Sequence, residues 1–219
     1  MPDIPNRASR RSMLRAALRA SFAGFSSVVS LTAPADARTA QLTPSQAEGP
    51  FYPVRVPTDH DGDLLVSGTG GHPAGSPLHL SGQVRNARGS PLTEVRVEIW
   101  QCDANGIYNH PAQPGVEHFD AAFQGFGAVD VDADARYQFL TIVPVPYPGR
   151  PPHIHVKLIR KGNTLLTTQL YLRGHPDNQR DWLLQRLLPS RRAALTLNLQ
   201  PVALANGRSG HAANFDFVV

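Results

Sequence analysis

Hydrophobic and polar positions alternate along many short stretches of this chain, which is the pattern of β-strands with one buried face. One stretch over 78–84 and a second over 95–100 flank a turn-forming segment, 86–91, and together they predict a hairpin. The same alternation predicts further strands over 136–142, 153–160, 164–172, 195–199 and 214–219.

A single stretch has helical spacing, because Leu184, Leu187 and Leu188 within 178–188 recur at i, i+3 and i+4. Many short strands separated by Gly- and Pro-containing turns favour an all-β fold. We therefore expect a β-sandwich of mostly antiparallel strands, with long active-site loops and one short helix near the C-terminus. Segment 103–135 is long enough to be one of these functional loops.

Composition narrows the kinds of site that this domain can hold. The chain has 219 residues, of which 41% are hydrophobic and 17% are charged, and this is typical of an ordinary globular protein. It has one cysteine, which excludes a disulfide framework and any zinc or iron–sulfur site built from several thiolates. A bound metal would have to take His, Tyr or carboxylate ligands.

The first 37 residues have the features of an export signal. Paired Arg10 and Arg11 precede a charge-free run over 20–33, and Ala35-Asp36-Ala37 forms an A-x-A cleavage motif. The run is shorter than the ~20 apolar residues that span a membrane. We therefore predict a twin-arginine-type signal peptide over 1–37 and a mature domain over 38–219. The protein would be periplasmic or secreted, without a stable membrane anchor.

The positive charge belongs mostly to that leader. Residues 1–37 contain five Arg and two Asp, which is a net of +3 out of the formal +4 of the whole chain. No cluster of Lys or Arg is interleaved with aromatic residues in the remainder. The sequence therefore predicts no nucleic-acid partner.

Two candidate metal-binding side chains lie close together in the motif His153-Ile154-His155. On a strand, residues i and i+2 point to the same face, so both imidazoles would project together while Ile154 and Val156 face the core. A pair of surface histidines explains this motif alone as well as a metal site does. Tyr108 and Tyr147 lie in loop-like contexts and would complete a site of two tyrosines and two histidines, whose phenolates suit Fe(III).

The motifs that accompany these residues follow a recognisable order along the chain. The ordered stretches are Gly49-Pro50-Phe51-Tyr52, Val97 to Ala104 leading to Gly106-x-Tyr108, Phe123-x-Gly125, Tyr137-x-Phe139-x-Thr141-Ile142, Tyr147-Pro148, Arg150-x-x-His153-Ile154-His155 and Leu166 to Tyr171. In this order they resemble the intradiol ring-cleavage dioxygenases, the family of catechol 1,2-dioxygenase and protocatechuate 3,4-dioxygenase. The short spacing between Tyr147 and His153 is similar to the compact, exported branch of that family.

The resemblance implies a ligand set and a reaction. Tyr108, Tyr147, His153 and His155 would bind one Fe(III) per subunit, with Tyr147 and His155 axial and a hydroxide or water as fifth ligand. Tyr147 would also act as an internal base for the catechol protons. The reaction would use O2 to cleave a catechol-type ring between its two hydroxyl-bearing carbons, giving a cis,cis-muconate-type diacid.

Two further residues carry over from the family pattern as catalytic groups. Arg150 would stabilise negative charge beside the substrate, and Gln169 would direct its amide toward the site. Without the resemblance, Arg150 is equally consistent with a surface loop arginine and Gln169 with a buried structural amide.

Two other classes of function stay open at this point. A cupin-like Fe(II) oxygenase would need a carboxylate and a third histidine after the His153–His155 pair. A non-catalytic periplasmic β-sandwich binding module would need no metal and would leave the Tyr, His, Arg and Gln set unexplained. The choice of catechol is open as well, with walls expected from 50–85 and 103–135, where His110 and His118 are candidates. A homo-oligomer is compatible with the sequence.

Overall fold

The structure is a computed structural model that describes residues 40–66, 71–203 and 209–219. The predicted signal peptide over 1–37 lies outside these residues. These described residues all belong to one compact unit.

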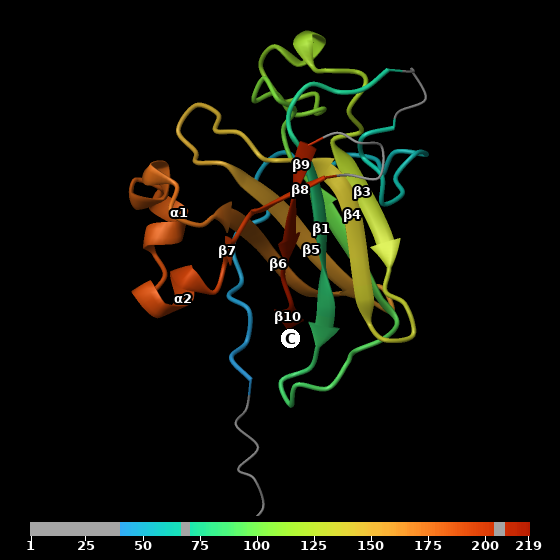
Figure 1. The fold of residues 1–219 in the computed structure, drawn as a ribbon, viewed down its shortest axis with the longest axis vertical. Coiled ribbons are helices and arrows are strands. Elements are labelled where there is room, and N and C mark those ends of the chain that lie inside the picture. The colour runs from blue at the N-terminus through green and yellow to red at the C-terminus, as the bar shows by residue number, and fades with distance from the viewer. Residues whose placement is uncertain (1–39, 67–70, 204–208) are drawn as a thin grey trace, which may run out of the picture. The chain divides into compact units, whose positions relative to one another are not determined.

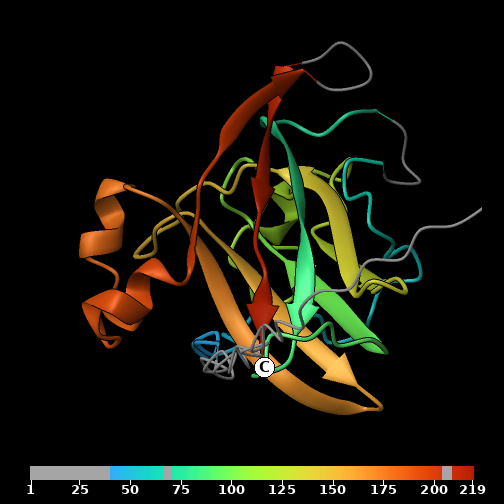
Figure 2. The same ribbon diagram turned by 60° about the horizontal axis from the view of Figure 1, so that its bottom comes forward.

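Two five-stranded sheets make up this unit, and they lie as two layers (Figure 1 and Figure 2). The first sheet has the order β10-β1-β9-β8, and β4 pairs with the other edge of β1. The second sheet has the order β3-β2-β5-β6-β7. The predicted β-sandwich is therefore confirmed. The strands are β1 (Pro77–Arg85), β2 (Val95–Trp100), β3 (Phe126–Asp130), β4 (Arg136–Ile142), β5 (His153–Arg160), β6 (Asn163–Leu172), β7 (Thr196–Leu197), β8 (Gln200–Ala203), β9 (Ser209–Asn214) and β10 (Phe217–Val218).

The core fills the space between the two layers. Leu78 and Leu80 of β1 and Phe139 of β4 belong to the same buried cluster as Ile154 and Val156 of β5. Because side chains on a strand alternate between faces, the neighbours of Ile154 and Val156 lie on the opposite, outer face of the second sheet. That outer face carries the candidate site, and loops cover it.

The predicted hairpin between 78–84 and 95–100 is wrong, because β1 and β2 belong to different sheets. The segment 86–91 does turn, and a single bridge joins Arg85 to Pro91. Proline has no N–H to extend a ladder, and Glu94 then takes a left-handed conformation with φ 59°. The chain crosses to the second sheet there. The alternation of hydrophobic and polar residues therefore predicted both strands correctly, but not the strands with which they pair.

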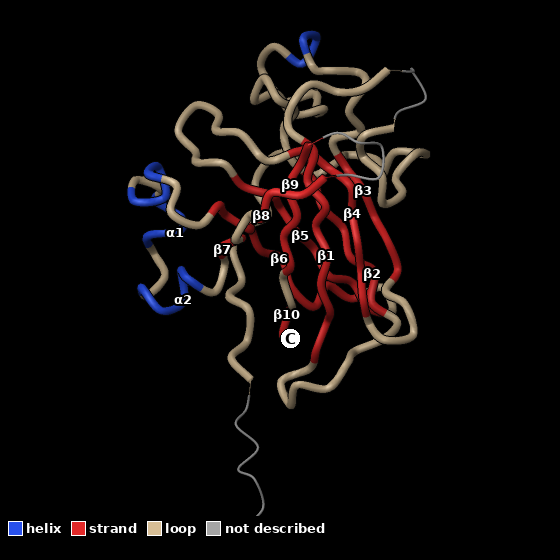
Figure 3. The backbone as a smooth tube through the Cα atoms, viewed as in Figure 1, coloured by secondary structure: helices blue, strands red, loops and turns tan. Residues whose placement is uncertain are grey.

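Helices are confined to short segments (Figure 3). In place of one helix over 178–188, the chain forms a 3-10 turn at Pro176–Gln179, α1 (Trp182–Gln185) and α2 (Pro189–Ala193). Another 3-10 turn, Val116–His118, lies in the loop between β2 and β3. Within the described ranges, no helix is long and apolar enough to cross a membrane.

Candidate active site

Strand β5 presents both predicted histidines on the covered outer face of the second sheet. His153 and His155 are each 1% exposed. Cross-strand pairing places Trp100 of β2 and Gln169 of β6 on either side of His155, and Tyr171 beside His153. The Trp100 ring stacks on His155 with centroids 4.8 Å apart and an interplanar angle of 10°. The strand period predicted for His-x-His therefore gives two rigidly packed imidazoles.

Tyr108 is held by the loop that follows β2. The buried carboxylate of Asp103 accepts hydrogen bonds from the backbone N–H groups of Asn105 and Ile107, at 2.9 Å each. Between them Gly106 has a φ of 79°, and a Cβ there would lie 3.3 Å from Cβ of Tyr147. The turn therefore requires glycine, and it brings the two tyrosine-bearing loops into contact.

Tyr147 and Arg150 lie at the two ends of one tight turn. The backbone N–H of Arg150 donates to the Tyr147 carbonyl at 2.9 Å, and the Tyr147 N–H donates back at 3.3 Å. The Tyr147 ring lies 5.5 Å from the Tyr108 ring and 5.5 Å from the His153 ring, centroid to centroid. The structure thus brings together the four side chains that the sequence nominated as ligands.

The segment 44–52 covers this cluster, and it is fixed along the edge of β6. Thr168 donates its hydroxyl to the Pro44 carbonyl at 2.7 Å, and the Gln169 amide donates to the Ala47 carbonyl at 2.9 Å. Gly49 has a φ of 78°, and a Cβ there would lie 3.2 Å from the His155 ring. Phe51 then stacks on Tyr108 at 4.6 Å. The Gly-Pro-Phe-Tyr motif is therefore a lid packed directly on the candidate ligands.

The donor atoms fit a metal ion. The Nδ1–H of His153 is placed to donate to the Pro151 carbonyl at 2.7 Å, which leaves its Nε2 lone pair facing the site. That Nε2 lies 3.1 Å from Nε2 of His155, close to the roughly 3 Å expected for two adjacent ligands bound at about 2.1 Å. The buried Tyr108 hydroxyl finds no hydrogen-bond partner of ordinary geometry among the described residues. A shared cation would satisfy these atoms.

Burial sets the protonation of the metal-free site. It lowers the pKa of His153 to about 3 and, with the neighbouring His153, lowers the pKa of His155 well below its ordinary value. Burial also raises the pKa of both phenols, although the nearby Arg150 lowers that of Tyr147 in part. The histidines are therefore neutral and ready to bind a metal, whereas each tyrosine must release a proton to do so.

These shifts predict that the metal-free protein is sensitive to acid. The unfolded chain protonates its histidines below about pH 6.5, but folded His153 does not do so until about pH 3, so stability falls as the pH falls through this window. His153 alone would cost on the order of 3 kcal/mol by pH 4. Urea unfolding at pH 7 and pH 4 measures this loss, and His153→Gln should reduce it. Equal losses in the two proteins would contradict the prediction.

Arg150 and Gln169 meet in one hydrogen-bonded network beside the histidines. Nη2 of Arg150 donates to Oε1 of Gln169 at 2.6 Å and to the Tyr171 hydroxyl at 3.3 Å. Nε of Arg150 donates to a carboxylate oxygen of Asp181 at 2.7 Å. Gln169 is fully buried and lies in register with His155. Both predicted catalytic residues therefore lie at the site, with Arg150 held at two nitrogens of its guanidinium, Nε and Nη2.

A cavity of about 350 Å³ adjoins the cluster and is bounded by Tyr147, Arg150 and Asp181, with Asp177 and Arg180. Tyr147 and Arg150 are half-buried, whereas Tyr108, His153 and His155 are buried. A ligand therefore reaches the cluster most directly from the Tyr147 and Arg150 side.

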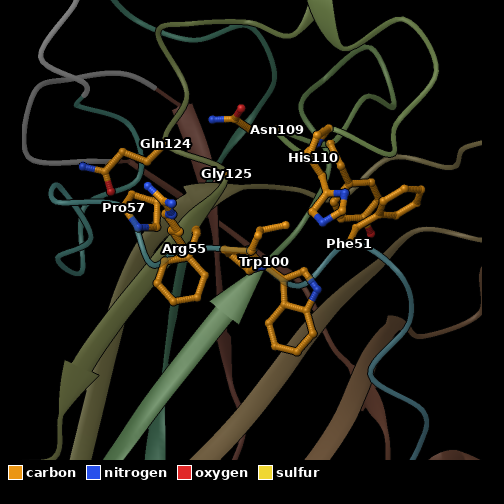
Figure 4. Close-up of a pocket in the computed structure, with 13 residues that line it drawn as sticks. Phe51, Arg55, Pro57, Trp100, Asn109, His110, Gln124 and Gly125 are labelled. Atoms are coloured by element: carbon orange, nitrogen blue, oxygen red, sulfur yellow. The ribbon is translucent and has the colours of Figure 1, made fainter.

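A second hollow, of about 290 Å³, borders Tyr108 (Figure 4). Most of its walls come from 51–57 and 108–126, within the segments predicted from the sequence, and they include His110 and Phe51, while Trp100 lies outside those segments. His110 accepts a hydrogen bond from the Ala112 N–H on Nδ1, so its neutral form presents Nε2–H as a donor. His118 is exposed and lies beside Glu117 instead.

Sequence reasoning missed three contributors to the site. Trp100 stacks on His155 and Phe51 stacks on Tyr108, although neither position is singled out by a sequence pattern of its own. Asp181 was not singled out. Its position before Trp182-Leu183-Leu184 is an N-cap signal, but nothing in the sequence connects it to Arg150.

The cupin-like alternative does not match the described residues, which contain no group of three or more His, Cys, Asp or Glu side chains placed to hold a metal. The two histidines of β5 are instead accompanied by two phenols.

Comparisons with known proteins agree with this geometry. A family model described as Dioxygenase (Dioxygenase_C) matches residues 47–219. The protocatechuate 3,4-dioxygenase beta chain of Burkholderia cepacia is 33% identical over 170 residues, which cover 74% of this chain and 70% of that relative. Catechol 1,2-dioxygenase 1 of Acinetobacter lwoffii is 32% identical over 152 residues, which cover 61% of this chain and 47% of that relative.

A solved structure is similar over nearly its whole length. It is the dioxygenase domain of a dioxygenase carbohydrate-binding protein fusion from Streptomyces sp. SirexAA-E, with a TM-score of 0.62 and 36% identity. The match covers 82% of this chain and 98% of that domain. By contrast, the chain spans about half the length of the hydroxyquinol and catechol 1,2-dioxygenases that it matches.

Proposed function

Because this chain belongs to the intradiol ring-cleavage dioxygenase family, we propose that it cleaves the ring of a catechol-type diol between its two hydroxyl-bearing carbons with O2. The product would be a cis,cis-muconate-type diacid. The observation that carries this proposal is the convergence of two buried imidazoles and two phenols on one point, with Nε2 of His153 and His155 3.1 Å apart.

Tyr108, Tyr147, His153 and His155 would hold one Fe(III) per subunit. When bound, Fe(III) would supply a Lewis acid that binds the diol oxygens and makes the ring reactive toward O2. Two phenolates and two neutral imidazoles form a donor set of net charge −2, which favours the ferric over the ferrous state.

The chain's own residues would handle the protons and the charge. Tyr147 is the half-buried phenol next to the cavity, so its oxygen would accept a proton from the incoming diol. The Arg150 guanidinium lies beside Tyr147 and would stabilise the negative charge that develops on substrate oxygens. The lid residue Phe51 and the stacked Trp100 would keep water from the buried side of the site.

The visible spectrum of the iron-loaded protein tests the proposal. Phenolate-to-Fe(III) charge transfer should give a wine-red protein, and anaerobic addition of catechol should shift the band to longer wavelength. A colourless protein with stoichiometric iron would point to a ferrous site. A protein that binds no metal would favour the non-catalytic binding module.

We also propose export through the twin-arginine route, with the paired Arg10 and Arg11 as support. Replacing both with Lys should leave the precursor inside the cell, whereas replacing Arg15 and Arg19 with Lys should not. Fractionation followed by immunoblotting measures this. Equal export of the two variants would contradict the proposal.

A further inference from the structure

Asp181 is a buried carboxylate that has two separate tasks. Its side chain is 0% exposed. One oxygen accepts a hydrogen bond from the Leu184 N–H at 2.6 Å and caps α1, while the other accepts from Nε of Arg150 at 2.7 Å. A cap needs only one oxygen and no charge. The second oxygen and the negative charge therefore need another explanation.

We propose that Asp181 is a positioning residue that fixes the Arg150 guanidinium toward the substrate cavity, an inference that rests on the proposed ring-cleavage function. Arg150 is anchored at Nε by Asp181 and at Nη2 by Gln169. Anchors on two different nitrogens fix the plane of the guanidinium, whereas the Nη2 contacts to Gln169 and Tyr171 alone would leave it able to rotate about that single nitrogen. Asp181 acts on the substrate only through Arg150.

The charges around this pair support the assignment. The side chain of Arg150 is 13% exposed, so the pair lies largely away from water, where an ion pair with good geometry is strong. Asp177 is another carboxylate that lines the cavity, but among the described residues its ion-pair contact is with His175 and not with Arg150. Asp181 is therefore the carboxylate that orients Arg150.

The two tasks of Asp181 can be separated by substitution. Asp181→Asn keeps a capping oxygen but turns an amide N–H toward Nε–H of Arg150, so two donors face each other. Asp181→Glu keeps the charge but is a poorer cap. A positioning role predicts that kcat falls about ten- to hundredfold in the Asn variant and stays within about threefold of the original in the Glu variant. The Glu variant should have the lower melting temperature.

A matched control lies far along the chain. Asp216 also accepts a backbone N–H, that of Gln83, on one oxygen and Nε of Arg85 on the other, but it is remote from the site. Asp216→Asn should leave kcat unchanged.

A second readout needs neither iron nor turnover. Phenylglyoxal modifies accessible arginine side chains, and peptide mass spectrometry of the metal-free protein reports the rate at Arg150. That rate should rise several-fold in Asp181→Asn and remain at the original level in Asp181→Glu and Asp216→Asn.

The opposite ranking, with kcat kept in the Asn variant and lost in the Glu variant, would show that Asp181 is only a cap. An unchanged phenylglyoxal rate in the Asn variant would overturn the proposal too. If Asp181→Asn does not fold, Asp181→Ser, which also keeps a capping oxygen without charge, takes its place. Loss of the proposed function would look different, because the unsubstituted protein itself would then cleave no catechol.

Discussion

Replacing Tyr108 with Phe should cost the protein its iron, and the colour with it, and lower ring cleavage by about 10³-fold or more. Changes to residues that merely support metal ligands already cost about 10–100-fold, and this substitution would remove a ligand outright. Metal content, the visible spectrum and kcat, measured on the same sample, provide the test.

The fold should tolerate this change well. The Tyr108 hydroxyl is buried without a hydrogen-bond partner of ordinary geometry among the described residues, so its removal leaves no donor or acceptor stranded. A Phe ring would keep the stacking with Phe51. The metal-free variant should therefore unfold at the same temperature as the original protein, or slightly higher.

Tyr137 is the matched control, because it is a buried tyrosine away from the site. Its hydroxyl donates to the Phe215 carbonyl at 2.6 Å and so joins β4 to the segment between β9 and β10. Tyr137→Phe should keep the colour and the activity but lose about 1 kcal/mol of stability. His60 contacts the Pro57 carbonyl through Nδ1 and is not a candidate ligand, so His60→Ala should likewise retain iron and activity. If Tyr108→Phe binds iron with full colour, the ligand assignment is wrong.

The sequence predicted those parts of the fold that depend on local alternation. The strand expected over 136–142 is β4 residue for residue, and 153–160 is β5. The prediction from the sequence failed where the structure depends on which strands pair with each other. The crossing after Pro91 separates β1 from β2, and β3 and β9 were missed because small residues such as Gly127 and Gly210 weaken their hydrophobic pattern.

In the candidate site, too, the features set by local sequence could be predicted, whereas those set by contacts between distant segments could not. His153 and His155 share a face because of strand period alone, and that was readable from the sequence. Tyr108 and Tyr147 could be nominated by resemblance, but their proximity depends on two loops that meet at Gly106. The ion pair of Arg150 with Asp181 joins residues from separate loops, and no local pattern encodes such a contact.

Replacing Arg150 with Met should damage both stability and activity, and the two effects should be separable. Met fills the volume of the Arg stem, but it leaves Asp181 as an unpaired buried charge, which typically costs about 3–5 kcal/mol. The guanidinium beside the substrate is lost as well, which should lower kcat by about 10²-fold or more. Chemical denaturation of the metal-free protein measures the first effect, and steady-state kinetics with catechol measure the second.

The double variant Arg150→Met with Asp181→Asn separates the two losses. Asn removes the stranded charge and keeps an oxygen for the Leu184 N–H, so most of the lost stability should return. Activity should stay as low as in Arg150→Met, because no cation is restored beside the cavity. If activity recovers together with stability, Arg150 contributes to the fold alone. If neither recovers, the cost of Arg150→Met comes from lost packing and not from the stranded charge of Asp181.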